Sequence, residues 1–238
     1  MKKVVIILIF LFFAWGSLSN IHAQEQNIPT NHLWFDFYNF FPITEKLEYG
    51  GDLGFRHAFS DFPWTRIYIR PTLAYRWKEK IRFLGGFKFA YTSQDILANT
   101  FEIRPWLGIK INWPKIRRFT FQHFLRLEQR FQFNTGSDSW ASETRLRYRL
   151  GTRVPINHPT IIDKTFYLPL WAEFFRNARG DLTERFASKV RLTAGLGYRF
   201  DKKWRLEFEY TYQGSRSFRQ DEFRGSDNLF HLKLRWYH

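Results

Sequence analysis

From Leu47 to the C-terminus the sequence alternates apolar and polar residues in segments of about ten residues each. A period of two is typical of a β-strand with two unlike faces. Here one face is rich in aromatic residues and the other in arginine, and the segments are joined by short charged turns and longer polar loops. This pattern predicts an all-β chain folded as an antiparallel, up-and-down β-barrel.

Alternation alone does not say which face of such a barrel points inward. A soluble barrel of the lipocalin kind encloses its apolar face, whereas a transmembrane barrel turns that face toward lipid and encloses a polar lumen. The 28 phenylalanines exceed what a small interior can pack, which favours the transmembrane barrel. Tryptophans also recur at one end of the expected strands. We expect an aromatic girdle at the membrane interface, made of Trp77, Trp113, Trp204 and Trp236.

The alternating pattern matches roughly eleven strands, from residues 34–41 to residues 229–237. Single-chain bacterial barrels almost always close with an even number of strands, so we expect ten or twelve. The connections at 78–80, 114–118 and 201–203 are short, while those between them are longer. Since short turns face the periplasm in this class of barrel, we expect the longer loops to face the exterior.

The N-terminus has the layout of a secretory signal peptide. Lys2 and Lys3 precede an apolar run at residues 4–15, and small and polar residues lead to Ala23. The run is shorter than the roughly twenty apolar residues of a transmembrane helix. We therefore expect a signal peptide at residues 1–23 and an outer-membrane barrel of a Gram-negative bacterium at residues 24–238.

The formal net charge of +15 would suggest nucleic-acid binding in a soluble protein. Export argues against that function, and the basic residues are spaced two apart along strands instead of being clustered. The chain has no cysteine, which excludes disulfides and thiolate metal sites. We expect no cofactor and no nucleic acid, with outer-membrane lipid and small anionic solutes as partners.

The arginine-rich face is the one concentrated chemical feature. A tight hairpin at 114–118 would set Glu102 opposite Arg130 and Arg104 opposite Glu128. Inward basic residues outnumber inward acids, so unpaired cations would require water or anions in the lumen. Alternatively, arginines stack on Tyr68 and Trp106 and extend their charged groups toward the ends of the barrel. The predicted lumen-lining basic residues are Arg66, Arg70, Arg82, Arg104, Arg126, Arg130, Arg145, Arg147 and Arg149, with Glu102 and Glu128 as acidic partners.

We find no residue pattern that predicts catalysis. Acyl hydrolysis needs a nucleophile and a histidine within reach, and His57 with Ser60 and Asp61 is the nearest approach to such a group. No two histidines have the spacing of metal ligands. We therefore predict no catalytic and no metal-binding residue.

Three short motifs resemble an uncharacterised outer-membrane β-barrel family that is catalogued only as a domain of unknown function. They are LWF at residues 33–35, RLRYRL at 145–150 and the hairpin AGLGYRFDKKW at 194–204. The resemblance extends over nearly all of the chain after residue 23, and the family brings no known catalytic residues. The end of the chain departs from the commonest barrel pattern, because His238 follows Trp236 and Tyr237.

Two functions follow from the barrel itself: a narrow, porin-like passive channel with a preference for anions, or a purely structural barrel. A lipid-modifying hydrolase and a surface-binding barrel that uses its long loops remain alternatives. A water path lined by Arg70, Arg126 and Arg147 would favour the channel, whereas a nucleophile and a histidine brought together would favour the hydrolase.

Overall fold

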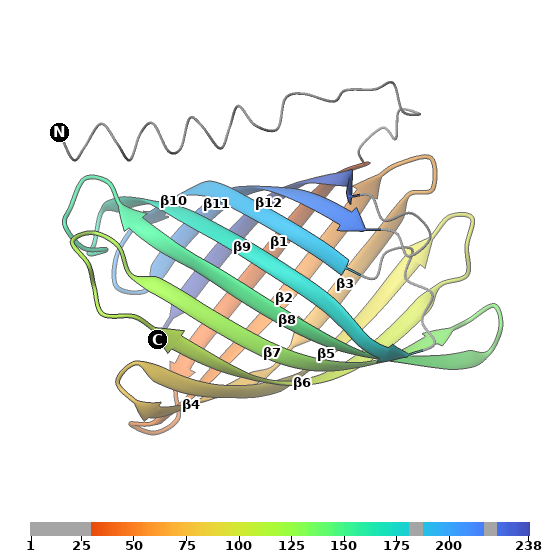
Figure 1. The fold of residues 1–238 in the computed structure, drawn as a ribbon, viewed down its shortest axis with the longest axis horizontal. Coiled ribbons are helices and arrows are strands. Elements are labelled where there is room, and N and C mark those ends of the chain that lie inside the picture. The colour runs from red at the N-terminus through yellow and green to blue at the C-terminus, as the bar shows by residue number, and fades with distance from the viewer. Residues whose placement is uncertain (1–29, 181–187, 217–222) are drawn as a thin grey trace.

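The computed structural model describes residues 30–180, 188–216 and 223–238, which form one closed β-barrel (Figure 1). The predicted signal peptide at 1–23 lies outside these residues. In the described ranges no helix is long and apolar enough to cross a membrane. The all-β barrel predicted from the alternating pattern is confirmed.

Twelve strands make up the barrel wall in the described part of the chain. Each runs in the direction opposite to the preceding strand, except that β3 and β4 follow one another in the same direction. Their bounds are β1 (Thr30–Pro42), β2 (Leu47–Phe59), β3 (Trp64–Arg70), β4 (Thr72–Lys78), β5 (Ile81–Gln94), β6 (Thr100–Asn112), β7 (Phe121–Asn134), β8 (Ser139–Pro155), β9 (Thr165–Gly180), β10 (Ser188–Arg199), β11 (Trp204–Arg216) and β12 (Phe223–Tyr237).

Strands β3 and β4 occupy a single place in the wall, between β2 and β5. They are separated only by Pro71, which has no backbone N–H to give to a neighbouring strand. The Pro71 carbonyl still accepts a hydrogen bond of 3.2 Å from the Phe87 N–H on β5. The wall therefore has eleven strand positions, in agreement with the eleven alternating segments of the sequence.

The barrel closes between β1 and β12, and this seam is parallel. The pairing runs from Thr30 with Asp227 to Phe40 with Tyr237. With eleven positions the first and the last strand must point the same way, so the barrel is antiparallel everywhere except at this seam. The twelve strands agree with the expected number. Because β3 and β4 share one place, the closed wall itself has an odd number of positions, unlike most bacterial barrels.

All the short turns predicted from the sequence lie at one end of the barrel, which we call the turn end. The opposite rim is the loop end. Among the described residues the two ends do not differ in the length of their connections as expected, because the strands continue into segments that looked like loops. The connections are 43–46, 79–80, 113–120, 156–164 and 200–203 at the turn end, and 60–63, 95–99 and 135–138 at the loop end.

The outer face of the wall is apolar and the inner face is polar. On β6 and β7, Leu107 is 68% exposed and Leu127 is 51% exposed, whereas their neighbours Trp106 and Glu128 are buried inside. Transmembrane barrels also have an apolar outer face and a polar inner face, whereas lipocalins have the opposite arrangement.

The four tryptophans predicted to form a girdle lie at the turn end, on or next to β4, β6, β11 and β12. Trp77 and Trp113 are exposed on the outer face. Trp204 and Trp236 are cross-strand partners whose rings stack with centroids 6.0 Å apart. The four tryptophans therefore lie at the same end of the barrel wall.

Candidate functional site

The candidate site is the lumen, a cavity of about 470 Å³ to which all twelve strands contribute side chains. Seventeen basic residues line it in the described part of the chain, against six acidic ones. Three further acids, Glu102, Glu143 and Glu207, are buried in the wall beside it and pair with lining arginines. The lumen therefore holds a large surplus of positive charge.

Glu128 on β7 is the centre of the largest group of ion pairs. Its carboxylate is fully buried and accepts hydrogen bonds from Arg145 Nη2 at 2.6 Å, Arg104 Nη1 at 3.1 Å and Arg126 Nη1 at 3.2 Å. Arg147 Nη1 lies 4.0 Å from the same carboxylate. One carboxylate thus ties β6, β7 and β8 together on the inner face.

Glu102 extends this group toward the loop end. It pairs with Arg104, and it accepts a 2.9 Å hydrogen bond from Arg130 Nη2, while Arg130 Nη1 donates to Glu143 at 2.9 Å. The two pairs predicted from the sequence, Glu102 with Arg130 and Arg104 with Glu128, both form.

The register that suggested those pairs was nevertheless wrong by two residues. Glu102 lies directly opposite Gln132, and Glu128 lies opposite Trp106. The reason is that the connection between β6 and β7 spans 113–120 and is wider than the tight hairpin assumed. The pairs form because arginine and glutamate are long enough to reach diagonal neighbours.

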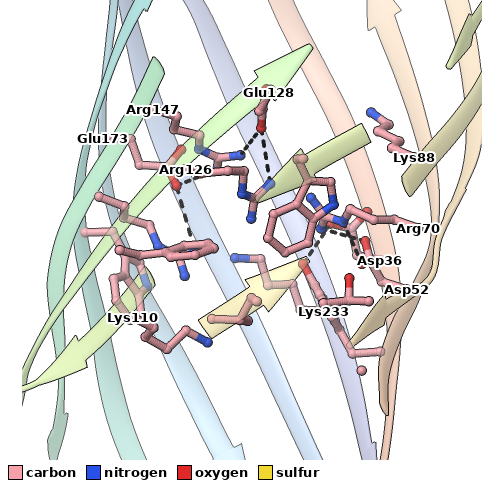
Figure 2. A pocket seen from close by; sticks show the side chains of 18 of the residues that line it. Asp36, Asp52, Arg70, Lys88, Lys110, Arg126, Glu128, Arg147, Glu173 and Lys233 are labelled. Carbon is pink, nitrogen blue, oxygen red and sulfur yellow. Dashed lines mark hydrogen bonds and ion pairs between the residues drawn. The ribbon is translucent and has the colours of Figure 1, made fainter. Parts of the chain in front are cut away.

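A second group of ion pairs joins the strands around the seam. Asp36 on β1 accepts a 2.8 Å hydrogen bond from the Tyr68 hydroxyl, lies 2.8 Å from His231 Nε2, and is 3.7 Å from Arg56 Nη2. Beside it, Arg70 binds Asp52 through Nε at 2.8 Å and Nη2 at 2.7 Å. Figure 2 shows this group across the lumen from the one around Glu128.

A third group lies near the turn end and is built around Glu207 on β11. This buried carboxylate accepts hydrogen bonds from Arg153 Nε and Arg235 Nε, both at 2.9 Å, and from the Tyr167 hydroxyl at 3.0 Å. Two residues further along β11, Glu209 pairs with Lys233.

The structure places all nine predicted basic residues on the lumen, together with Glu128, and it buries Glu102 next to them. The sequence predicted that many lumen cations would lack a protein partner, but most of them form ion pairs with carboxylates. The partners that it missed sit at inward positions of the alternating pattern, which was the available signal. They are Asp36, Asp52, Glu143, Glu173, Glu207 and Glu209.

Two lumen lysines have no carboxylate within 4.0 Å among the described residues. Lys88 Nζ lies 4.2 Å from the centre of the Tyr68 ring, and Lys110 Nζ lies 5.4 Å from that of Phe124. Figure 2 shows them on opposite sides of the ion pairs. The predicted stacking of arginine on Trp106 is present, since Arg126 Cζ lies 4.2 Å from that ring.

The residues considered for hydrolysis do not form a catalytic group. His57 is on the outer face of β2, where its Nδ1 lies 2.9 Å from the Thr65 hydroxyl, and Ser60 is exposed in the following connection. In the described ranges no three side chains of histidine, aspartate or glutamate gather as metal ligands.

Comparison with curated proteins finds no match for this sequence. A family model does match it, over residues 31–224, and the match runs from the first strand into the last. The matched region contains every acidic residue of the three ion-pair groups. The chain therefore belongs to the family described as Protein of unknown function (DUF2490).

Proposed function

We propose that this protein is an outer-membrane β-barrel that acts as a narrow, porin-like passive channel for small anions. In this proposal residues 1–23 direct export, and the barrel resides in the outer membrane of a Gram-negative bacterium. The apolar outer face and the tryptophans at the turn end support that location, because both match what a bilayer requires of a barrel wall.

The observation that carries the proposal is the charge of the lumen. Seventeen basic side chains line one polar cavity, and only nine acids line it or pair with its arginines in the described part of the chain. A lumen with a fixed positive surplus attracts anions and raises the barrier for cations. Small anions are therefore the solutes that this cavity favours.

Unsatisfied donors support a hydrated lumen. Five lumen arginines have a buried Nε atom with no hydrogen-bond partner among the described protein atoms: Arg56, Arg82, Arg126, Arg147 and Arg149. Buried donors of this kind are normally satisfied by ordered water or a bound ion. Five such atoms around one cavity support a water-filled passage instead of a dry plug.

The second candidate is a closed, structural barrel, and the group around Glu128 favours it. Four arginines from three strands converge on this carboxylate, and Arg126 also packs on Trp106. Small barrels are commonly filled by side chains in this way. Conductance separates the two candidates, because a filled lumen passes no current.

Reversal potentials in a planar bilayer test the channel. With a gradient of KCl across the bilayer, an anion-selective lumen shifts the reversal potential from zero toward the Nernst potential of chloride. If folded protein gives no single-channel current, the structural barrel is the remaining candidate. A preference for potassium over chloride would contradict the proposal. Cell fractionation tests the location, since recovery of the protein as a soluble periplasmic species would reject it.

A further inference from the structure

We propose that Arg82, Lys110 and Arg149 form a binding site for a small oxyanion with two negative charges, of the chemical class of phosphate or sulfate. The three residues come from β5, β6 and β8 and line the lumen. The inference rests on the hydrated lumen of the proposed function, because the ion reaches the site only through water. It goes further by naming a place and a class of solute.

Protein carboxylates neutralise these three cations only weakly, and the strand register places them side by side. Lys110 has no carboxylate within 4.0 Å among the described residues. Arg82 is 3.5 Å from Glu48, and about a third of each of these two side chains is exposed. Arg149 is 3.7 Å from Glu173, which already accepts a 2.6 Å hydrogen bond from Arg147.

The better-neutralised arginines show the contrast. Arg70, Arg130 and Arg145 each have a carboxylate oxygen within 3.0 Å, in buried pairs. Charge-assisted hydrogen bonds are strongest at such short distances. The uncompensated charge of the lumen is therefore concentrated at identifiable residues and is not spread evenly over the wall.

The strand register brings the three cations into one row across the wall. Arg82 lies directly opposite Lys110, Lys110 lies opposite Phe124, and Phe124 lies opposite Arg149. Lys110 Nζ is 5.4 Å and Arg149 Cζ is 5.6 Å from the centre of the Phe124 ring. The aromatic ring thus lies between two of the charges.

Like charges in direct cross-strand positions destabilise a sheet. Lys110 also interacts electrostatically with Arg153 and Arg235, two further cations of the lumen. Both of these donate to Glu207, so that carboxylate is already shared by two arginines. An anion beside Lys110 would offset this repulsion.

The free donors define the chemistry of the ligand. The Nε atoms of Arg82 and Arg149 are buried and lack a hydrogen-bond partner among the described protein atoms. Guanidinium groups match the paired oxygens of tetrahedral oxyanions, and lysine adds a compact charge. A tetrahedral oxyanion offers separate oxygens to donors on different strands, whereas a halide offers one atom, and a cavity of about 470 Å³ excludes large polyanions. Phosphate and sulfate fit both limits.

The test is a calorimetric titration of the purified, detergent-solubilised protein with inorganic phosphate, at an ionic strength held constant with KCl. We expect saturable binding that Lys110→Gln weakens by about tenfold or more, the loss typical of one charged hydrogen bond. Lys110→Arg keeps the charge and should stay within about threefold of the original protein.

Lys88→Gln is the matched control. It also removes a buried lumen lysine without a carboxylate partner, but on the far side of the ion pairs from Lys110 (Figure 2). We expect it to weaken phosphate binding by less than about threefold, because it acts only through screened long-range charge. Retention of the folded, heat-modifiable form on gels shows that each variant is assembled.

Equal weakening by Lys88→Gln and Lys110→Gln would overturn the site, because binding would then depend on total charge alone. Absence of saturable phosphate binding would overturn it as well. Chloride current without phosphate binding rejects the site and leaves the channel intact. Phosphate binding without chloride current rejects the channel and leaves a site in a hydrated but closed lumen.

Discussion

Arg153 on β8 donates a 2.9 Å hydrogen bond to Glu207 on β11, although β9 and β10 lie between these two strands in the wall. The contact bridges the curved inner surface, so it links strands that share no backbone hydrogen bonds. Tyr167 on β9 donates to the same carboxylate and fills the space between them.

Glu207→Gln should destabilise the barrel strongly. The side chain is fully buried, and its loss of charge would leave Arg153 and Arg235 in the lumen without their carboxylate. Breaking one side of a buried ion pair costs about 3 to 5 kcal/mol. Urea unfolding in detergent, followed by tryptophan fluorescence, measures the change.

The control for Glu207→Gln is Glu48→Gln. Glu48 pairs with Arg82 at 3.5 Å, and about a third of each side chain is exposed. Exposed pairs contribute about 1 kcal/mol or less, so this variant should unfold nearly as the original protein does. Equal destabilisation by the two variants would contradict the role given to Glu207.

Leu107→Arg and Leu125→Arg should impair assembly into membranes. Both leucines are exposed on the outer face, and arginine on the lipid face of a barrel costs about 2 to 4 kcal/mol at the bilayer midplane. Arg126→Gln changes the inner face and leaves Glu128 with three other arginines, so it should assemble normally. Heat-modifiability after refolding into vesicles reports assembly, and equal damage at both faces would show that the facing is misassigned.

Gly197→Ala should destabilise the barrel more than Gly85→Ala. A Cβ at position 197 would overlap the ring of Tyr167, which is fully buried and held by its hydrogen bond to Glu207. At position 85 the nearest atom is the end of the exposed Leu107 side chain, which can move. The denaturation midpoints of the two variants measure the difference in stability. A larger loss of stability for Gly85→Ala would argue against the close packing of Gly197 on Tyr167.

Anion selectivity should weaken as salt rises. Screening lengths fall from about 10 Å at 0.1 M to about 3 Å at 1 M salt, so fixed lumen charges act over less of the passage. Lys88→Glu should lower the selectivity at low salt, because it reverses one of the seventeen lining charges. Reversal potentials at several salt concentrations measure both effects, and a selectivity that does not change with salt would exclude fixed charge as its origin.

The strands could be predicted because alternation is a local property of the sequence, and the eleven alternating segments correspond to the eleven positions of the wall. The parallel seam was not predicted. It follows from an odd number of strand positions, whereas bacterial barrels usually have an even number of strands. The predicted arginines face the lumen because facing follows from the same period of two. Their partners were missed where, as for Arg153 and Glu207, contact depends on the curvature of the closed wall.

The parallel seam sets where the two ends of the wall lie. Thr30 begins β1 at the loop end, and Tyr237 finishes β12 at the turn end, so the ends are on opposite rims. A barrel with an antiparallel seam brings its ends to the same rim, where a short linker joins them. Here a linker would have to follow the length of the seam, roughly 35 Å at about 3.3 Å for each of its paired residues. Circular permutation with a short linker, tolerated by many barrels, is therefore incompatible with this one.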